Sequence, residues 1–418
     1  MYMKRRFYFI VTLALVASLC AGTVDARKKA KKVITPEEEI AAQLRQYMDT
    51  CRTAGMSVVL VKGDKVVYQA ALGYRDLATK DTLELTDIFR IASISKSFSA
   101  ASTLQLQAAG KLSLDDDVNK YLPFSLRNPR YPDIPITIKQ MLSHTTSMND
   151  YGGASWYHDD RYVNPARTTA DTIAMVFFDY APGWGFKYSN RGLNLMGMVI
   201  EKASGERFDN YVRQHILLPM GITNAGFNLD SLDKSTFTRL YTYNKKADSL
   251  KLAAGYIPSN EKKLADGTYR PVLDACDWSP TGGMKISAPD LAKWMMTIRD
   301  NGVAPNGVRI LSEADAIKMK TPVTPPDKSR SWQYYCLNLT WLTNIIEGRT
   351  LIGHTGSAQG LKSFMYFDKD SDWGIVGICS SDNNTSAINP DGVSGGVKIH
   401  YDVINYLFNR FKDTLLAE

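Results

Sequence analysis

Cysteine, histidine and long apolar segments are all scarce in this chain of 418 residues. Its five cysteines and five histidines are scattered, without the HExxH or paired-cysteine spacing of zinc sites. We therefore expect no metal and no cofactor. No apolar run beyond residue 20 approaches the ~20 uninterrupted residues that a membrane-spanning helix needs. A membrane domain is therefore not expected.

Excess charge is absent from the body of the chain. The formal net charge is +7, from 50 basic and 43 acidic residues. Residues 1–32 carry eight of the basic residues and one acidic residue, so the remainder holds 42 of each. Beyond residue 32 the basic and acidic residues are equal in number, so the chain lacks the excess positive charge that nucleic-acid binding requires. No nucleic-acid partner is therefore expected.

The N-terminus has the profile of a secretory signal. Three basic residues, Lys4-Arg5-Arg6, precede an apolar stretch that ends at Cys20 and is too short to span a membrane comfortably. Ala26 supplies a small residue for cleavage. The pattern predicts a signal peptide over 1–26, a basic linker over 27–34, and export to the periplasm or the medium. A lipid anchor at Cys20 is the alternative, although Leu19 fits that signal poorly.

An oxidising compartment would permit disulfides among the four cysteines that remain after cleavage. Their spacing selects no pairing. We favour small buried residues over bridges, and the disulfide state stays open.

The remaining chain, 35–418, predicts one domain with strands at both ends and helices between them. Thr35, Pro36 and Glu38 form a capping-box pattern for a first helix. Strand-like segments follow at Met56 to Val61, Val66 to Ala70, Tyr334 to Leu342, Leu361 to Phe367 and Trp373 to Cys379. Helical runs occur at Ser97 to Ala109, Thr137 to Ser143, Thr169 to Tyr180, Gly192 to Ala203, Phe208 to Leu218 and Val397 to Phe411. This order predicts a helical subdomain inserted over approximately 100–270, with a loop-rich stretch at Tyr241 to Asp277.

The strongest chemical signal is Ser93-Ile94-Ser95-Lys96, which opens a helical run. Positions i and i+3 share a helix face, so the Lys96 amine can lie beside the Ser93 oxygen and take its proton. The pair would activate a nucleophile without histidine.

Two later motifs support the interpretation of Ser93 and Lys96 as a catalytic pair. Tyr188-Ser189-Asn190 follows a turn-rich stretch, and His354-Thr355-Gly356 follows a short apolar segment. With the SxxK motif they resemble the serine β-lactamase and penicillin-binding-protein superfamily, from about Thr35 almost to the C-terminus. The tyrosine form of the second motif is similar to the branch with class C β-lactamases, DD-carboxypeptidases, D-aminopeptidases and esterases.

The resemblance implies an α+β fold, in which an antiparallel sheet flanked by helices packs against an all-helical lobe, with the site between them. It also implies a role for each motif. Ser93 would form an acyl-enzyme, and Lys96 and Tyr188 would carry protons, with the main base left open. Asn190 would orient Lys96 and a substrate amide. Thr355, Gly356 and Ser357 would form a strand edge for substrate, and the backbone N–H groups of Ser93 and Ser357 would form the oxyanion hole.

His354 stands where most β-lactamases carry lysine, and a neutral histidine offers a hydrogen bond instead of a fixed charge. Together, Tyr188-Ser189-Asn190 and His354-Thr355-Gly356 look more like the DD-peptidase and esterase members of the superfamily, and this resemblance implies a hydrolase of D-amino-acid peptides from cell-wall material. A β-lactamase or an esterase is the alternative, and a penicillin-binding sensor without turnover is a third possibility. The expected partner is therefore a small molecule or peptide, namely a cell-wall peptide, a β-lactam or an ester. The oligomeric state is not predicted.

Overall fold

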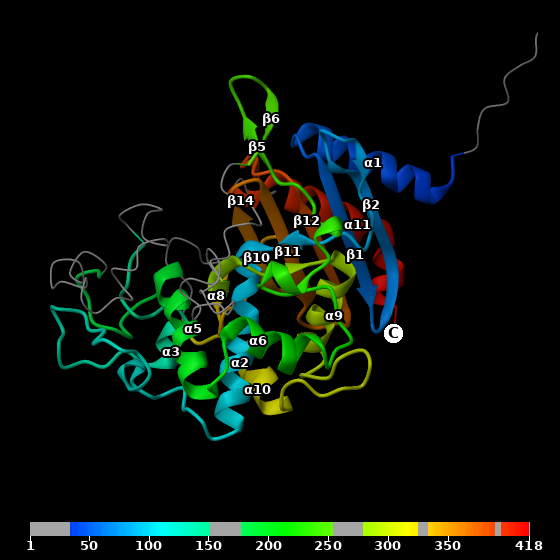
Figure 1. Cartoon of the computed structure of the whole chain (residues 1–418). Coiled ribbons are helices and arrows are strands. Elements are labelled where there is room, and N and C mark those ends of the chain that lie inside the picture. Colours follow the sequence, from blue (N-terminus) through cyan, green and yellow to red (C-terminus); the bar gives the residue numbers. More distant parts are fainter. Residues whose placement is uncertain (1–33, 151–176, 254–278, 325–332, 389–393, 418) are drawn as a thin grey trace, which may run out of the picture.

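The computed structural model describes residues 34–150, 177–253, 279–324, 333–388 and 394–417. A large antiparallel sheet with two helices on its outer face adjoins a helical lobe (Figure 1). The predicted signal peptide, nearly all of the basic linker and most of the predicted helix at Thr169 to Tyr180 lie outside the described residues. Within the described part of the chain, no helix is both long and apolar enough to cross a membrane.

The main sheet combines strands from both ends of the chain, as predicted. In order across the sheet they are β3 (Asp81–Thr82), β2 (Lys65–Asp76), β1 (Gly55–Lys62), β12 (Trp373–Cys379), β11 (Leu361–Asp368), β10 (Leu351–Ala358), β9 (Thr340–Leu342) and β8 (Gln333–Tyr335). Every pairing is antiparallel, and the N- and C-terminal segments meet where Val59 lies opposite Val376. The α+β fold with an antiparallel sheet is confirmed.

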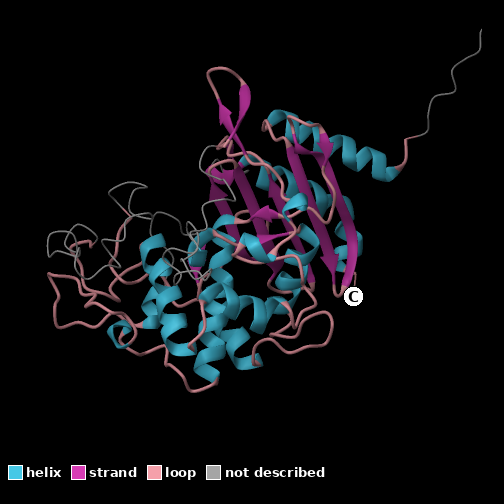
Figure 2. Cartoon of the chain, in the orientation of Figure 1, coloured by secondary structure: helices cyan, strands magenta, loops and turns pink. Residues whose placement is uncertain are grey.

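Both faces of the sheet are covered, which explains why β1 is buried along almost its whole length. Because side chains alternate along a strand, Val59 and Val61 pack with the helical lobe, while Val58 and Leu60 pack with the outer helices. The outer helices are α1 (Pro36–Thr50) and α11 (Lys398–Leu416). Figure 2 shows them on one side of the sheet and most other helices on the opposite side.

The predicted capping box begins α1. The Thr35 hydroxyl accepts from the Glu38 backbone N–H at 3.2 Å, and the Glu38 carboxylate accepts from the Thr35 N–H at 3.1 Å. Ile40, Leu44 and Met48 recur every four residues and turn one face of the helix to the sheet.

The helical lobe surrounds α2 (Lys96–Ala108), of which ten residues are buried. Its other described helices are α3 (Ile138–Leu142), α5 (Asn190–Ser204), α6 (Phe208–Val212), α8 (Ser279–Gly282), α9 (Ala288–Arg299), α10 (Glu313–Lys320) and a π-helical turn at Arg213–Leu217. Phe98 of α2 stacks on Trp294 of α9 at 4.5 Å between ring centroids. The Trp294 indole N–H donates to Ser97 at 2.9 Å, so α2 is fixed against the helix that covers the sheet.

Two predicted segments differ from the structure. The start of the expected loop at Tyr241 is a hairpin of β5 (Tyr241–Asn244) and β6 (Ser249–Leu252), which projects from the body (Figure 1). The expected strand at Tyr334 to Leu342 is instead the hairpin β8–β9, because Asn338 has a φ of 57° and reverses the chain. Other short strands are β4 (Phe89–Arg90), β7 (Lys285–Ile286), β13 (Ser386–Ile388) and β14 (Ser394–Val397).

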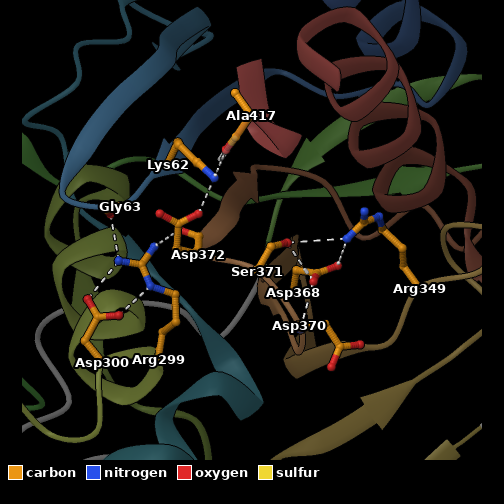
Figure 3. A network of polar contacts seen from close by, with 10 residues as sticks. All are labelled: Lys62, Gly63, Arg299, Asp300, Arg349, Asp368, Asp370, Ser371, Asp372 and Ala417. Carbon is orange, nitrogen blue, oxygen red and sulfur yellow. Dashed lines mark hydrogen bonds and ion pairs between the residues drawn. The ribbon is translucent and has the colours of Figure 1, made fainter. Parts of the chain in front are cut away.

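A polar network ties α9 to the turns at one end of the sheet (Figure 3). The Arg299 guanidinium donates to the Gly63 carbonyl at 2.7 Å and to the Asp372 carbonyl. Lys62 pairs with the Asp372 carboxylate at 2.5 Å and donates to the Ala417 carbonyl at 2.9 Å. These contacts join two hairpin turns to the end of α11.

A second ion pair in the same view joins Arg349 to Asp368 at 2.9 Å. The Asp368 side chain is 1% exposed, and it also accepts from the Ser371 hydroxyl at 2.8 Å. A buried carboxylate needs such partners, because its transfer from water is costly.

The three described cysteines, Cys51, Cys336 and Cys379, are buried and free. They agree with the expectation of small buried residues. Cys276 lies outside the described residues.

Candidate active site

Ser93 lies in a 3-10 turn, Ala92–Ser95, that runs directly into α2. Ala92 has a φ of 47°, a left-handed conformation that costs free energy for a residue with a Cβ. Ser93 is half-buried whereas both of its neighbours are buried. The strained turn therefore presents a serine at the start of a buried helix.

The structure brings Lys96 to Ser93 as the spacing predicts. The fully buried Lys96 amine lies 3.0 Å from Ser93 Oγ and donates to the Thr281 carbonyl at 2.8 Å. Burial lowers the pKa of Lys96 to about 7, Asp150 opposes this shift, and the charge of Arg90 adds to it. At neutral pH a large share of the amine is thus unprotonated, and the Ser93 hydroxyl can donate to it.

Tyr188 lies beside this pair, with Lys96 Nζ 5.1 Å from its ring centroid. His144 stacks on the Tyr188 ring at 4.3 Å, and the His354 ring lies 6.2 Å away. His144 Nδ1 accepts from the Ser189 backbone N–H at 3.2 Å. Tyr188 is thus packed between His144 and His354. His144 also accepts a hydrogen bond from the backbone of Ser189, the residue after Tyr188.

Both histidines are neutral near pH 7. Burial and the charge of Lys96 lower the pKa of His354 to about 4, and they hold the pKa of His144 well below its usual range. His354 Nδ1 lies 2.5 Å from the Thr355 carbonyl, which can only accept, so Nδ1 carries the proton. His354 thus contributes no positive charge where the resemblance would place a lysine.

In the described part of the chain, Asn190 makes no hydrogen bond to Lys96, and its predicted contact with a substrate amide stays a prediction. Its side chain donates to Asp150 Oδ2 at 2.9 Å, and its backbone N–H donates to the same carboxylate at 2.8 Å. The Ser189 hydroxyl and the Arg191 N–H also donate to Asp150. The reason is electrostatic: the N-terminus of α5 presents unpaired N–H groups and a positive dipole end, which attract a carboxylate.

Asp150 is the residue that sequence reasoning missed. It stands 40 positions before Asn190 in a segment without a recognisable motif, and only the tertiary fold brings the two together. Its carboxylate holds the start of α5 and also acts on the charge of Lys96.

The segment His354 to Ser357 lies on an open strand edge. β10 pairs with β11 along its whole length, whereas its described pairing with β9 stops at Gly353. A Cβ added to Gly356 would lie 2.2 Å from the Ile91 carbonyl oxygen and 2.1 Å from Ser363 Oγ. Glycine is therefore required at this position for β10 to approach the segment before Ser93.

Over the ranges that the structure describes, no group of three or more His, Cys, Asp or Glu residues could hold a metal ion.

Fold and site together define a serine hydrolase of the β-lactamase and penicillin-binding-protein type. The chain belongs to the Beta-lactamase family, whose model matches residues 40–392.

Three comparisons illustrate this membership. Protein flp of Staphylococcus aureus is 24% identical over 364 residues, which is 86% of this chain but only 66% of that protein, just under two thirds of its length. The octameric penicillin-binding protein homologue from Pyrococcus abyssi has a TM-score of 0.69 and 23% identity, over 90% of this chain and 79% of that one. The D-amino acid amidase from Ochrobactrum anthropi SV3 has a TM-score of 0.64 and 20% identity, over 89% of this chain and 99% of that one. At these identities the solved structures establish the fold alone.

Proposed function

We propose that this protein is an exported hydrolase of D-amino-acid peptides, which acts in the manner of a DD-carboxypeptidase through an acyl-enzyme on Ser93. The supporting observation is the fully buried Lys96 amine 3.0 Å from Ser93 Oγ, with its pKa lowered to about 7. A general base works best when its pKa lies near the working pH.

The chemistry would proceed in two steps. In the first, Ser93 Oγ bonds to the substrate carbonyl carbon while its proton passes to the neutral Lys96 amine. The backbone N–H groups of Ser93 and Ser357 would stabilise the oxyanion. The C–N bond then breaks, and the leaving nitrogen takes a proton delivered through Tyr188.

In the second step, water attacks the ester carbonyl and gives its proton to the Lys96 and Tyr188 pair. Breakage of the ester bond returns a proton to Ser93 Oγ and releases the acid. The position of Tyr188 near Lys96 suits both steps, since one group can relay a proton in either direction.

Two observations favour a peptide with a D-residue over a β-lactam. The neutral His354 lacks the charge that a lysine would supply at this position, and one solved structure of this fold is a D-amino acid amidase. The open edge of β10 would take the peptide backbone as an added strand.

The test is the release of a C-terminal D-amino acid from N-acyl-D-alanyl-D-alanine, with the L,L-dipeptide for comparison. We expect hydrolysis of the D,D-peptide alone. It should be lost in Ser93→Ala and retained in the matched control Ser235→Ala, which removes an exposed hydroxyl. Turnover of a penicillin with no peptide hydrolysis would instead assign a β-lactamase. Hydrolysis of esters only would assign an esterase, and a stable adduct without turnover would assign a sensor.

Export is part of the proposal and rests on the basic and apolar profile of residues 1–26. The mass of the protein recovered from the periplasm or medium should correspond to a chain that starts at Arg27. An intact N-terminus would contradict cleavage at this site, and a lipid-sized mass increase on Cys20 would assign an anchored form.

A further inference from the structure

A row of three aromatic side chains, Phe178, Tyr180 and Trp184, precedes the Tyr188 motif and takes no part in the proposed reaction. The Phe178 and Tyr180 rings stack at 5.7 Å between centroids, with 8° between their planes. The Tyr180 and Trp184 rings follow at 5.5 Å and 43°. Trp184 is 79% exposed, so the row ends in solvent. A single exposed apolar side chain is ordinary, whereas a row of stacked rings that reaches the surface indicates a binding site.

The backbone beneath this aromatic row is fixed from within the fold. Asn128 is fully buried, and its side-chain amide donates to the Phe178 carbonyl at 2.9 Å and to the Tyr180 carbonyl at 3.1 Å. The Phe178 backbone N–H donates to the Ser147 carbonyl at 2.8 Å. Because these bonds hold the two stacked rings in place, a ligand that binds them has little conformational entropy to remove.

The aromatic row is also tied to the candidate active site. The Lys187 backbone N–H donates to the His144 carbonyl at 2.8 Å, and the His144 ring stacks on Tyr188. Trp184 lies four positions before Tyr188. Four residues of extended chain span at most about 14 Å. A substrate of ordinary length can therefore contact Tyr188 and Trp184 at the same time.

Polar groups border the aromatic faces. Within the described chain, neither the Tyr180 hydroxyl nor the Trp184 indole N–H has a hydrogen-bond partner. The indole N–H can only donate, whereas the hydroxyl can donate and accept. At the other end of the row, the ammonium of the exposed Lys187 lies 5.3 Å from the centroid of the Phe178 ring. The row thus combines apolar faces with hydrogen-bonding groups at their edges.

This combination suits a sugar ring. A pyranose presents a face of C–H groups that can lie on the negative face of an aromatic ring, and its rim of hydroxyl groups both donates and accepts hydrogen bonds. A protein partner fits less well, because a specific interface buries about 800 Å² on each partner. One aromatic side chain supplies only about 150–250 Å².

We propose that Phe178, Tyr180 and Trp184 form a saccharide subsite, which binds an amino sugar of the glycan that carries the peptide substrate. This inference rests on the proposed function and narrows its substrate class from free peptides to glycan-linked peptides. A cell-wall peptide is joined to its glycan at its N-terminal end. A stem of four residues spans at most about 14 Å, the same limit as the chain between Trp184 and Tyr188.

The experiment compares one peptide that ends in D-alanyl-D-alanine in two forms, with its N-terminus either acetylated or joined to a disaccharide of N-acetylglucosamine and N-acetylmuramic acid. A second measurement follows the binding of the N-acetylglucosamine tetramer by calorimetry. Each is made on the full chain, as the wild type, Trp184→Ala, Trp184→Phe and the matched control Val66→Ala. Val66 is 50% exposed and lies on β2.

We expect the wild type and Val66→Ala to prefer the glycan-linked peptide by about 10-fold in kcat/KM, the size of a good aromatic stacking contact. Trp184→Ala should lose this preference and bind the tetramer about 10-fold more weakly. Trp184→Phe keeps a smaller ring and should retain part of both effects. Equal rates for the acetylated peptide in all four proteins would show that the variants are folded.

Equal rates for the two peptides in the wild type would overturn the saccharide subsite, as would a preference that survives in Trp184→Ala. Tetramer binding that Trp184→Ala leaves unchanged would place the sugar elsewhere and also count against it. If neither peptide is hydrolysed, the proposed function fails, and calorimetry alone decides the subsite.

Discussion

Acylation of Ser93 should follow the protonation of Lys96. With a pKa of about 7, the neutral fraction of the amine is roughly one half at pH 7 and about 1% at pH 5. Because only the neutral amine can accept the Ser93 proton, the acylation rate constant should fall about 50-fold between these pH values. Above pH 8 it should reach a plateau.

This fall in the acylation rate constant reports the protonation of Lys96, because the neighbouring histidines titrate at lower pH. The pKa of His354 is about 4, and that of His144 lies well below its usual range. Arg90, which also donates to the Gly282 carbonyl at 2.7 Å, lowers the pKa of Lys96 by its charge. Arg90→Met should therefore raise the pKa of Lys96 and move the midpoint of the pH dependence of acylation to higher pH.

The assay follows the single-turnover release of nitrophenol from a nitrophenyl ester with enzyme in excess, from pH 5 to pH 10. Circular dichroism at each pH shows whether the protein stays folded. A rate that keeps rising to pH 10 would mean that Lys96 has an ordinary pKa. A midpoint near 7 that Arg90→Met leaves in place would refute the electrostatic part of the reasoning.

Three further predictions concern the groups that hold the site and the sheet. Asp150→Asn should lower the free energy of unfolding in urea by about 1–2 kcal/mol, because the carboxylate at the start of α5 loses its charge; an unchanged value would contradict its capping role. His144→Phe keeps a ring against Tyr188 but removes the acceptor of a buried N–H, so stability should fall by about 1–3 kcal/mol and acylation should slow. Wild-type unfolding and acylation in that variant would show that the contact is dispensable. Arg349→Met leaves the buried Asp368 without its ion pair and should cost about 1–3 kcal/mol by urea denaturation, whereas no loss would mean that the remaining hydrogen bonds suffice.

The features that could be predicted from the sequence depend on residues close together in the chain. The pairing of Lys96 with Ser93 follows from three residues of helical spacing. The capping box of α1 joins Thr35 and Glu38, which are also three apart. The sheet segments at Leu361 to Phe367 and Trp373 to Cys379 follow from apolar, β-branched and aromatic composition.

The features that could not be predicted depend on contacts across the chain. The engagement of Asn190 by Asp150 arises because a loop happens to meet the positive end of α5. Lys362 of β11 is buried and donates a hydrogen bond to Ser357 of β10, and a lysine within an apolar run gives no sign of such a contact. The turn within β8–β9 rests on the conformation of Asn338, which the surrounding strand pattern conceals.

The most direct test of the acyl-enzyme is the intact mass of the protein after brief reaction with a nitrophenyl ester of N-acyl-D-alanine and an acid quench. The account predicts a mass increase equal to the acyl group, located by peptide mapping on Ser93, that decays as product appears and is absent from Ser93→Ala. An adduct of the same mass on Ser93→Ala, or one located on another residue of the wild type, would contradict it.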